Sequence, residues 1–169
     1  MLISNIVPFG MFKEKYRVLF SLAKPYLEKN DLGVAHTKRV LDIALKHFHI
    51  PRELEELVHV SIILHDIGGC SIKDQYEKGP KIATKLLKQL SYNHQIILEV
   101  CEIIRTHHER TAAPTEPFKI LYDADQLAKF SEEEFPSYNS ENIDWNSIID
   151  SMYQKHAKML ARKMFNAKN

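Results

Sequence analysis

The sequence predicts an all-α protein, a single bundle of about six or seven helices around one core. Apolar residues recur at helical spacing along most of the 169-residue chain. No segment shows the period-two alternation that is typical of a half-buried strand. The length is that of one ordinary domain, and a hydrophobic content of 44% is enough for a substantial core. We therefore expect one domain spanning residues 1–169.

The first third of the chain is expected to contain an irregular start and two helices. Residues 1–10 hold a proline and a glycine and are expected to be irregular. A helix is expected from Met11, and Pro25 should kink or end it. The next helix, at about residues 34–48, has a regular apolar stripe. His36 lies on the same inward face as this stripe.

The third helix is expected to begin at Pro51 and to end in the segment VSIILHDIGG. Apolar residues fill positions 60–64 too densely for a helix with one solvated face, so this segment should be buried on several sides. His65 and Asp66 follow side by side, and two glycines then stop the helix. An imidazole and a carboxylate are both metal ligands, and burying them unpaired is costly.

The sequence after residue 68 predicts further amphipathic helices. Residues 69–79 are expected to form a polar connection, and Pro80 should open the next helix. Apolar stripes then predict helices at about residues 93–107, 117–130 and 145–165. Prolines and acidic residues predict loops at 111–117 and 131–142, and the acidic run at 131–134 is interpreted as solvated.

Composition and charge exclude several classes of function. A net charge of +1 argues against a strongly electrostatic nucleic-acid binder. No apolar run approaches the roughly 20 residues of a membrane span, and the N-terminal segment lacks the pattern of a signal peptide. The chain has only two cysteines, in no paired motif, which fits a reducing compartment. We therefore expect a cytoplasmic protein without a membrane partner.

Three predicted helices each direct a metal-ligating side chain inward. The four residues are His36, His65, Asp66 and Asp125. Taken alone, His36 also fits an ordinary core histidine, but a buried aspartate such as Asp125 is rare unless it is paired or binds a metal. Together they form a set of nitrogen and oxygen ligands that suits Mn, Fe, Ni, Co or Mg. The set lacks the cysteines that are typical of a structural zinc site.

The order of these residues resembles the HD-domain superfamily of metal-dependent phosphohydrolases. The resemblance depends on His36, then HDIG at residues 65–68 and ADQL at residues 124–127, and it covers about residues 30–130. It implies an α-helical HD-domain-like bundle in which His36, His65, Asp66 and Asp125 bind one divalent metal ion. It also implies hydrolysis of a phosphate ester, often of a nucleotide, by a metal-activated water.

The sequence departs from the superfamily at the ligands of a second metal ion. Two-metal members usually add a histidine before the fourth helix and another in a histidine pair. The pair is present as His107–His108, but the earlier position falls near Gly79, without a histidine nearby. We therefore expect one metal ion. The run HHER resembles the cyclic-dinucleotide phosphodiesterase branch, but TAAPTEP replaces the motifs that continue that branch.

Three residues are predicted to act in catalysis. Asp66 would orient the attacking water as well as bind the metal. His107 would contact the phosphate or the leaving group, although a histidine near a helix C-terminus also satisfies the helix dipole. Lys73 would contact the phosphate, and the alternative is an ordinary solvated lysine.

Two other functions remain as alternatives. The domain could be a regulatory module that keeps the metal site and binds a nucleotide without hydrolysing it. It could also be a structural bundle in which the inward histidines and aspartates pair with one another. For the enzyme, the predicted partner is a small-molecule phosphate ester. The sequence does not distinguish nucleotides from sugar phosphates, monoesters from diesters, or one oligomeric state from another.

Overall fold

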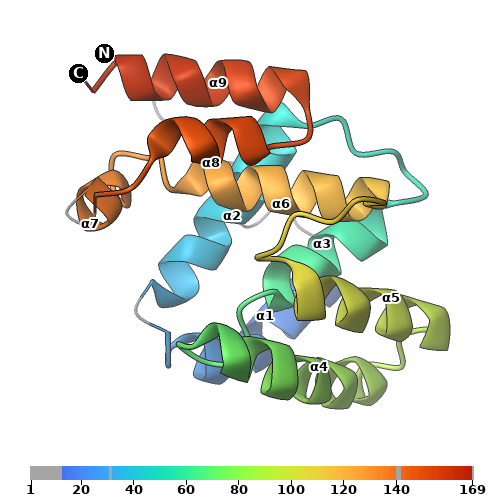
Figure 1. Cartoon of the computed structure of the whole chain (residues 1–169). Coiled ribbons are helices and arrows are strands. Elements are labelled where there is room, and N and C mark those ends of the chain that lie inside the picture. Colours follow the sequence, from blue (N-terminus) through green and yellow to red (C-terminus); the bar gives the residue numbers. More distant parts are fainter. Residues whose placement is uncertain (1–12, 31, 140–141, 169) are drawn as a thin grey trace.

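The structure is a computed structural model that describes residues 13–30, 32–139 and 142–168. The irregular segment expected at residues 1–10 lies outside the described residues. Within them the chain forms nine helices and no strand, which confirms the all-α prediction but exceeds the expected six or seven helices. None of the described helices is both long and apolar enough to cross a membrane. The helices (Figure 1) are α1 (Glu14–Leu27), α2 (Gly33–His47), α3 (Glu55–Leu64), α4 (Ile72–Gln89), α5 (His94–Thr106), α6 (Glu116–Ala128), α7 (Phe135–Asn139), α8 (Trp145–Ser151) and α9 (Lys155–Asn166).

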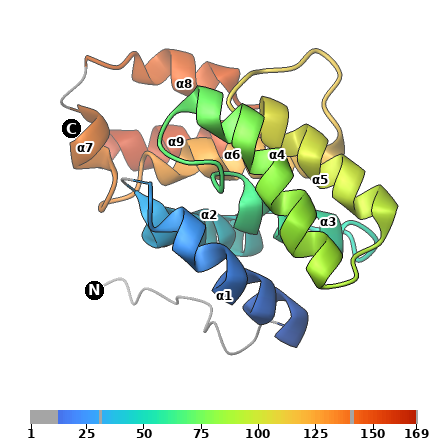
Figure 2. The ribbon, with the colours of Figure 1, turned by 90° about the horizontal axis from the view of Figure 1, so that it is seen from below.

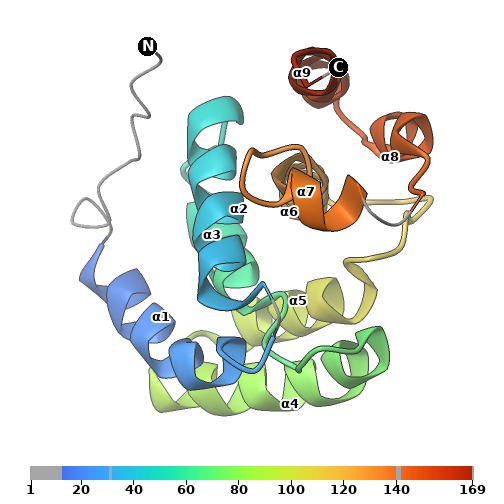
Figure 3. The same cartoon turned by 90° about the vertical axis from the view of Figure 1, so that its left-hand side faces the viewer.

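Helix α3 lies at the centre of the bundle. It packs against α1, α2, α5 and α6. Figure 3 shows α2 and α3 between α4 at one end of the molecule and α9 at the other. Every residue from Leu57 to Leu64 is buried, which confirms the prediction that this segment is buried on several sides. The residues that follow α3 therefore emerge inside the protein, beside four other helices.

Helices α4 and α5 form an antiparallel hairpin, and Figure 2 shows them side by side. The predicted connection over residues 69–79 is wrong, because α4 begins at Ile72 and Pro80 lies inside it. The Ser71 hydroxyl accepts a hydrogen bond from the Asp74 backbone N–H at 3.1 Å and so caps the helix. Pro80 cannot donate a helical hydrogen bond, and α4 packs against α5 along its length.

Two glycines allow α4 to lie against the turn that follows α3. A Cβ atom at Gly68 would lie 2.4 Å from the Cα of Gln75, which is a clash with backbone. A Cβ atom at Gly79 would lie 2.9 Å from a side-chain methyl of Ile104. Gly79 itself lies near Gly68. This contact brings Gln75 of α4 beside the turn that carries His65 and Asp66.

The C-terminal helix expected at residues 145–165 is broken in two. Met152 is extended, with φ −60° and ψ 149°, and it separates α8 from α9. Asp123 of α6 is fully buried, and its two carboxylate oxygens accept hydrogen bonds from the backbone N–H groups of Tyr153 and Gln154, both at 2.8 Å. Asp123 thus binds the start of α9 and fixes the break, and it does not face the predicted ligands.

We expect Asp123→Ala to destabilise the protein by roughly 2 to 4 kcal/mol, because it leaves two backbone N–H groups without their acceptor. Urea unfolding followed by circular dichroism measures this loss. The substitution should leave metal binding intact, since these hydrogen bonds lie outside the predicted ligand set. A loss of less than 0.5 kcal/mol, within the ordinary range for surface changes, would contradict the structural role of Asp123.

The segment after α6 differs from the solvated loop that the sequence predicts. Helix α7 lies within it, and Glu134 is only 2% exposed. The backbone N–H of Glu134 donates to the Ser131 hydroxyl at 3.2 Å, so this turn is capped. The acidic residues Glu132 and Glu133 are exposed, as the sequence predicts.

Candidate metal centre

Three mutually packed helices bring the four predicted ligands together. His36 lies in the first turn of α2, His65 and Asp66 directly follow α3, and Asp125 lies in α6. Each pair among α2, α3 and α6 is in contact. The four side chains therefore meet where these helices converge, although 89 positions separate His36 from Asp125 in the sequence.

The ligating atoms converge on a small volume. The Nε2 atom of His36 lies 3.2 Å from Nε2 of His65 and 3.0 Å from Oδ1 of Asp125. Oδ2 of Asp66 lies 3.4 Å from Nε2 of His65 and 3.7 Å from Nε2 of His36. The distance from His65 Nε2 to Asp125 Oδ1 is 4.0 Å. Two imidazole nitrogens and two carboxylate oxygens thus surround one point.

The hydrogen bonds of His65 fix which of its nitrogens faces the other ligands. Its Nδ1 lies 2.8 Å from the Ile62 carbonyl oxygen, which can only accept, so Nδ1 carries the proton. The Nε2 lone pair of the neutral ring is then free to bind a cation. An ion with bonds of about 2.1 Å holds adjacent ligands about 3 Å apart and opposite ligands about 4 Å apart. The observed spacing fits such an ion.

A second group of ligands shares Asp66. Its other oxygen, Oδ1, lies 3.2 Å from Nε2 of His107, and Asp66, His107 and His108 together could hold a metal ion. His107 Nδ1 donates to the Ile104 carbonyl at 2.8 Å, so Nε2 is the nitrogen that faces Asp66. The Nε2 atom of His108 instead contacts the Gln75 side-chain oxygen. Asp66 therefore faces both groups at once.

Comparison with known proteins identifies the family. The model of the HD domain family matches residues 33–129, more than half of the chain. The chain belongs to the HD domain family. No curated protein matches. A crystal structure described as a predicted HD superfamily hydrolase, from an uncultured Thermotogales bacterium, is similar with a TM-score of 0.63 and 19% sequence identity, covering 90% of this chain and 86% of that chain. That structure shares the fold, and the family resemblance found in the sequence is confirmed.

Electrostatics in this HD domain favour the ionisation states that bind metals. Burial raises the pKa of Asp125, but the hydrogen bond with His36 and the nearby positive charge of Lys129 and His36 together outweigh burial and hold the pKa well below its usual range. The pKa of Asp66 is also low, because His65 and His107 outweigh the effect of burial. Burial lowers the pKa of His65. Both aspartates are therefore ionised and His65 is neutral.

His36 is the exception, because carboxylates flank both of its nitrogens. Burial lowers its pKa, but hydrogen bonds with Asp125 and Glu134 outweigh burial and raise the pKa from 6.5 to about 10. Without a metal, His36 thus holds a proton between two carboxylates. A divalent cation at Nε2 would supply positive charge at the same place and would displace that proton.

The centre of the HD domain is open to solvent on one side. The side chain of Asp66 is 15% exposed, whereas that of His65 is fully buried. A hollow of about 210 Å³ adjoins this side. It is lined by Asn30, Leu32, Asp66, Cys70, Ile72, Gln75, His108 and Tyr138. A small molecule in this hollow would contact Asp66.

The two remaining predicted catalytic residues, His107 and Lys73, lie in different surroundings. His107 is 1% exposed and contacts Asp66, so it lies within the centre. Lys73 is exposed in the first turn of α4 and does not line the hollow beside Asp66. Its predicted contact with a phosphate stays a prediction.

Sequence reasoning missed one buried residue at the centre. Oε1 of Glu134 lies 2.9 Å from Nδ1 of His36, and Arg39 forms an ion pair with the same carboxylate. No periodic apolar stripe surrounds Glu134, and it belongs to an acidic run with two exposed neighbours. A possible signal was the apolar pair Phe130 and Phe135 on either side of the run, which anchors both of its ends.

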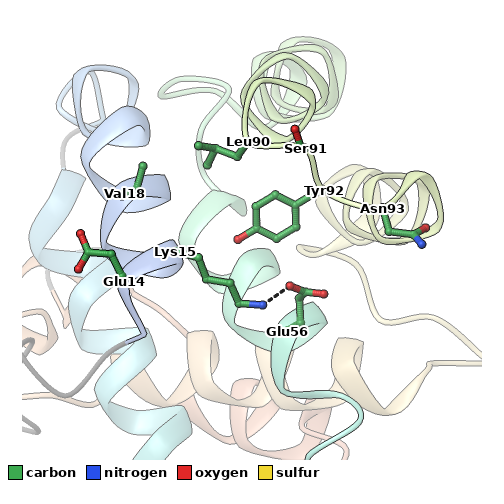
Figure 4. A pocket seen from close by; sticks show the side chains of 8 residues that line it. All are labelled: Glu14, Lys15, Val18, Glu56, Leu90, Ser91, Tyr92 and Asn93. Carbon is green, nitrogen blue, oxygen red and sulfur yellow. Dashed lines mark hydrogen bonds and ion pairs between the residues drawn. The ribbon is translucent and has the colours of Figure 1, made fainter.

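A larger hollow of about 540 Å³ lies away from the centre, between α1, α3 and the α4–α5 turn (Figure 4). Lys15 pairs there with Glu56, and the Tyr92 ring lies beside them. Burial, and next Glu56, raise the pKa of Tyr92 to about 12, so its hydroxyl is neutral. The residues that line this hollow belong to neither of the two candidate metal-binding groups.

Proposed function

We propose that this HD domain is a metal-dependent hydrolase of a phosphate ester, with a nucleotide or a related phosphorylated metabolite as substrate. The observation that carries the proposal is the convergence of His36, His65, Asp66 and Asp125 beside an open hollow. The Nε2 atoms of the two histidines lie 3.2 Å from each other and 3.0 to 4.0 Å from oxygens of the two aspartates. A divalent ion bound there would acidify water and stabilise negative charge on a phosphoryl group.

The residues divide into ligands and groups that act on the substrate. His36, His65, Asp66 and Asp125 would hold one divalent ion of Mn, Fe, Ni, Co or Mg. Asp66 is the ligand that lines the hollow, so it would orient the attacking water as well as bind the ion. His107 contacts Asp66 Oδ1 and would in turn orient that carboxylate or contact the phosphate.

The hollow favours a small substrate. Its volume of about 210 Å³ suits one phosphorylated small molecule. Among the residues that line the hollow, Leu32, Ile72 and Tyr138 would contact the organic part, and Asp66 and His108 would face the phosphate. Lys73, which is exposed one residue after Ile72, would contact the phosphate. We propose that residues 1–169 act as one domain in this reaction.

Metal content and hydrolysis test the proposal together. The chain would be stripped with a chelator and supplied in turn with Mn, Fe, Ni, Co and Mg. Elemental analysis measures the ions per chain, and a panel of nucleoside monophosphates, sugar phosphates and p-nitrophenyl mono- and diesters measures hydrolysis. We expect about one ion per chain and hydrolysis that disappears with the chelator and returns with the ion.

Other outcomes would change the assignment in defined ways. Two ions per chain would place the second at Asp66, His107 and His108. If nucleotides raise the melting temperature but no product forms, the protein would be a metal-containing nucleotide-binding module and not an enzyme. A chain that binds none of the ions would contradict the proposal and indicate that the histidines and aspartates pair internally.

A further inference from the structure

We propose that Glu134 is a positioning residue for the metal ligand His36, and that Arg39 holds Glu134 in place. Glu134 would fix the ring of His36 with Nε2 toward the other ligands and strengthen Nε2 as a ligand. This inference rests on the metal site of the proposed function, but it requires no particular substrate. It assigns a role in metal binding to a residue that lies outside the ligand set.

The hydrogen bonds of the three inward histidines differ in one respect. His65 and His107 each donate Nδ1–H to the carbonyl three residues earlier in their own chain segment, at 2.8 Å. His36 lies in the first turn of α2, and its Nδ1 contacts Oε1 of Glu134 at 2.9 Å. A carboxylate partner withdraws the Nδ1 proton more strongly than a carbonyl does, which makes Nε2 a better ligand.

Contacts within its own segment hold Glu134 in this position. The Ser131 hydroxyl accepts its backbone N–H at 3.2 Å, so the turn after α6 is capped and its backbone is fixed. The side chain is 2% exposed, whereas Glu132 in the same turn is exposed. Within the described residues Oε2 of Glu134 has no hydrogen-bond partner. The known contacts of the carboxylate are therefore with His36 and Arg39 through Oε1.

Arg39 supplies the charge that allows a carboxylate to be buried there. It lies three residues after His36, on the same face of α2, and it is 19% exposed. Its guanidinium group pairs with Glu134, and its Nε lies 3.4 Å from Glu133. A buried charge is costly unless it is paired, and this ion pair meets that requirement. Arg39 therefore holds the Glu134 carboxylate where it contacts His36.

Metal titration of the chelator-stripped chain tests the inference. Co²⁺ is the probe, and its visible absorption reports both affinity and coordination geometry. We expect Glu134→Gln, which keeps the size and an acceptor oxygen but removes the charge, to raise the Kd for Co²⁺ by about 10- to 100-fold. Arg39→Met should also raise the Kd for Co²⁺. Glu132→Gln, in the same turn but exposed, is the matched control and should change nothing.

The readout separates positioning from a merely structural role. A structural role would lower the melting temperature of Glu134→Gln and leave the Kd and the Co²⁺ spectrum within twofold of the parent, and this result would overturn the inference. If the parent binds Co²⁺ but hydrolyses no ester, the proposed function fails and the Kd comparison still decides the inference. A parent that binds no Co²⁺ would overturn both.

Discussion

Asp66→Ala is expected to abolish metal binding and phosphate-ester hydrolysis together, with helicity close to that of the parent. Asp66 is the one residue shared by the two candidate metal groups, and its two oxygens face His65 and His107. No substitution at another ligand removes a donor from both groups. We expect at least a 100-fold loss of metal affinity, more than the loss of an outer hydrogen-bond partner causes. Elemental analysis and the ester panel measure it.

The matched control for Asp66→Ala is Asp123→Ala. Both remove an aspartate from the interior of the bundle, but Asp123 holds the start of α9 instead of facing the ligands. The control should lose stability and keep its metal. Retained hydrolysis in Asp66→Ala would show that the site is misassigned. An unfolded Asp66→Ala chain would show that the metal also stabilises the fold.

Gly68→Ala should cause the largest loss of stability among single methyl additions at the described glycines. The new Cβ would lie 2.4 Å from Gln75 Cα and 2.5 Å from the Asp74 carbonyl oxygen. Both atoms belong to the backbone of α4, so no side-chain rotation relieves the clash. We expect a loss of about 3 kcal/mol or more in the free energy of unfolding. For a chain of this size that corresponds to a melting temperature lower by roughly 6 to 12 °C.

Gly79→Ala provides the comparison for this prediction. Its Cβ would meet Ile104 at 2.9 Å, but the contact is with a side-chain methyl group that can move. Its cost should therefore be clearly smaller than that of Gly68→Ala in the same urea titration. Equal losses for the two variants, or a loss below 1 kcal/mol for Gly68→Ala, would contradict the close backbone contact between α4 and the turn after α3.

The two glycines also explain a prediction that failed. Sequence reasoning treated Pro80 as a helix start, because proline cannot donate the backbone hydrogen bond of a helix interior. In the structure α4 already begins at Ile72. The reason is tertiary: Gly68 and Gly79 allow α4 to lie against the preceding turn, and this packing extends the helix through the proline. Local preferences alone do not contain that contact.

The sequence by itself determined the helical class, the buried segment before His65 and the three helices that carry the ligands. These features follow from local periodicity, since an inward face is defined by spacing along one helix. The tertiary structure alone decided which polar residues meet. Asp123 and Asp125 lie two positions apart on one helix, yet one binds the backbone of α9 and the other faces His36. Glu134 lies in an acidic run, and it is buried because α2 presents Arg39 and His36 at that point. A charged side chain is placed by its partners, and those partners are distant in the sequence.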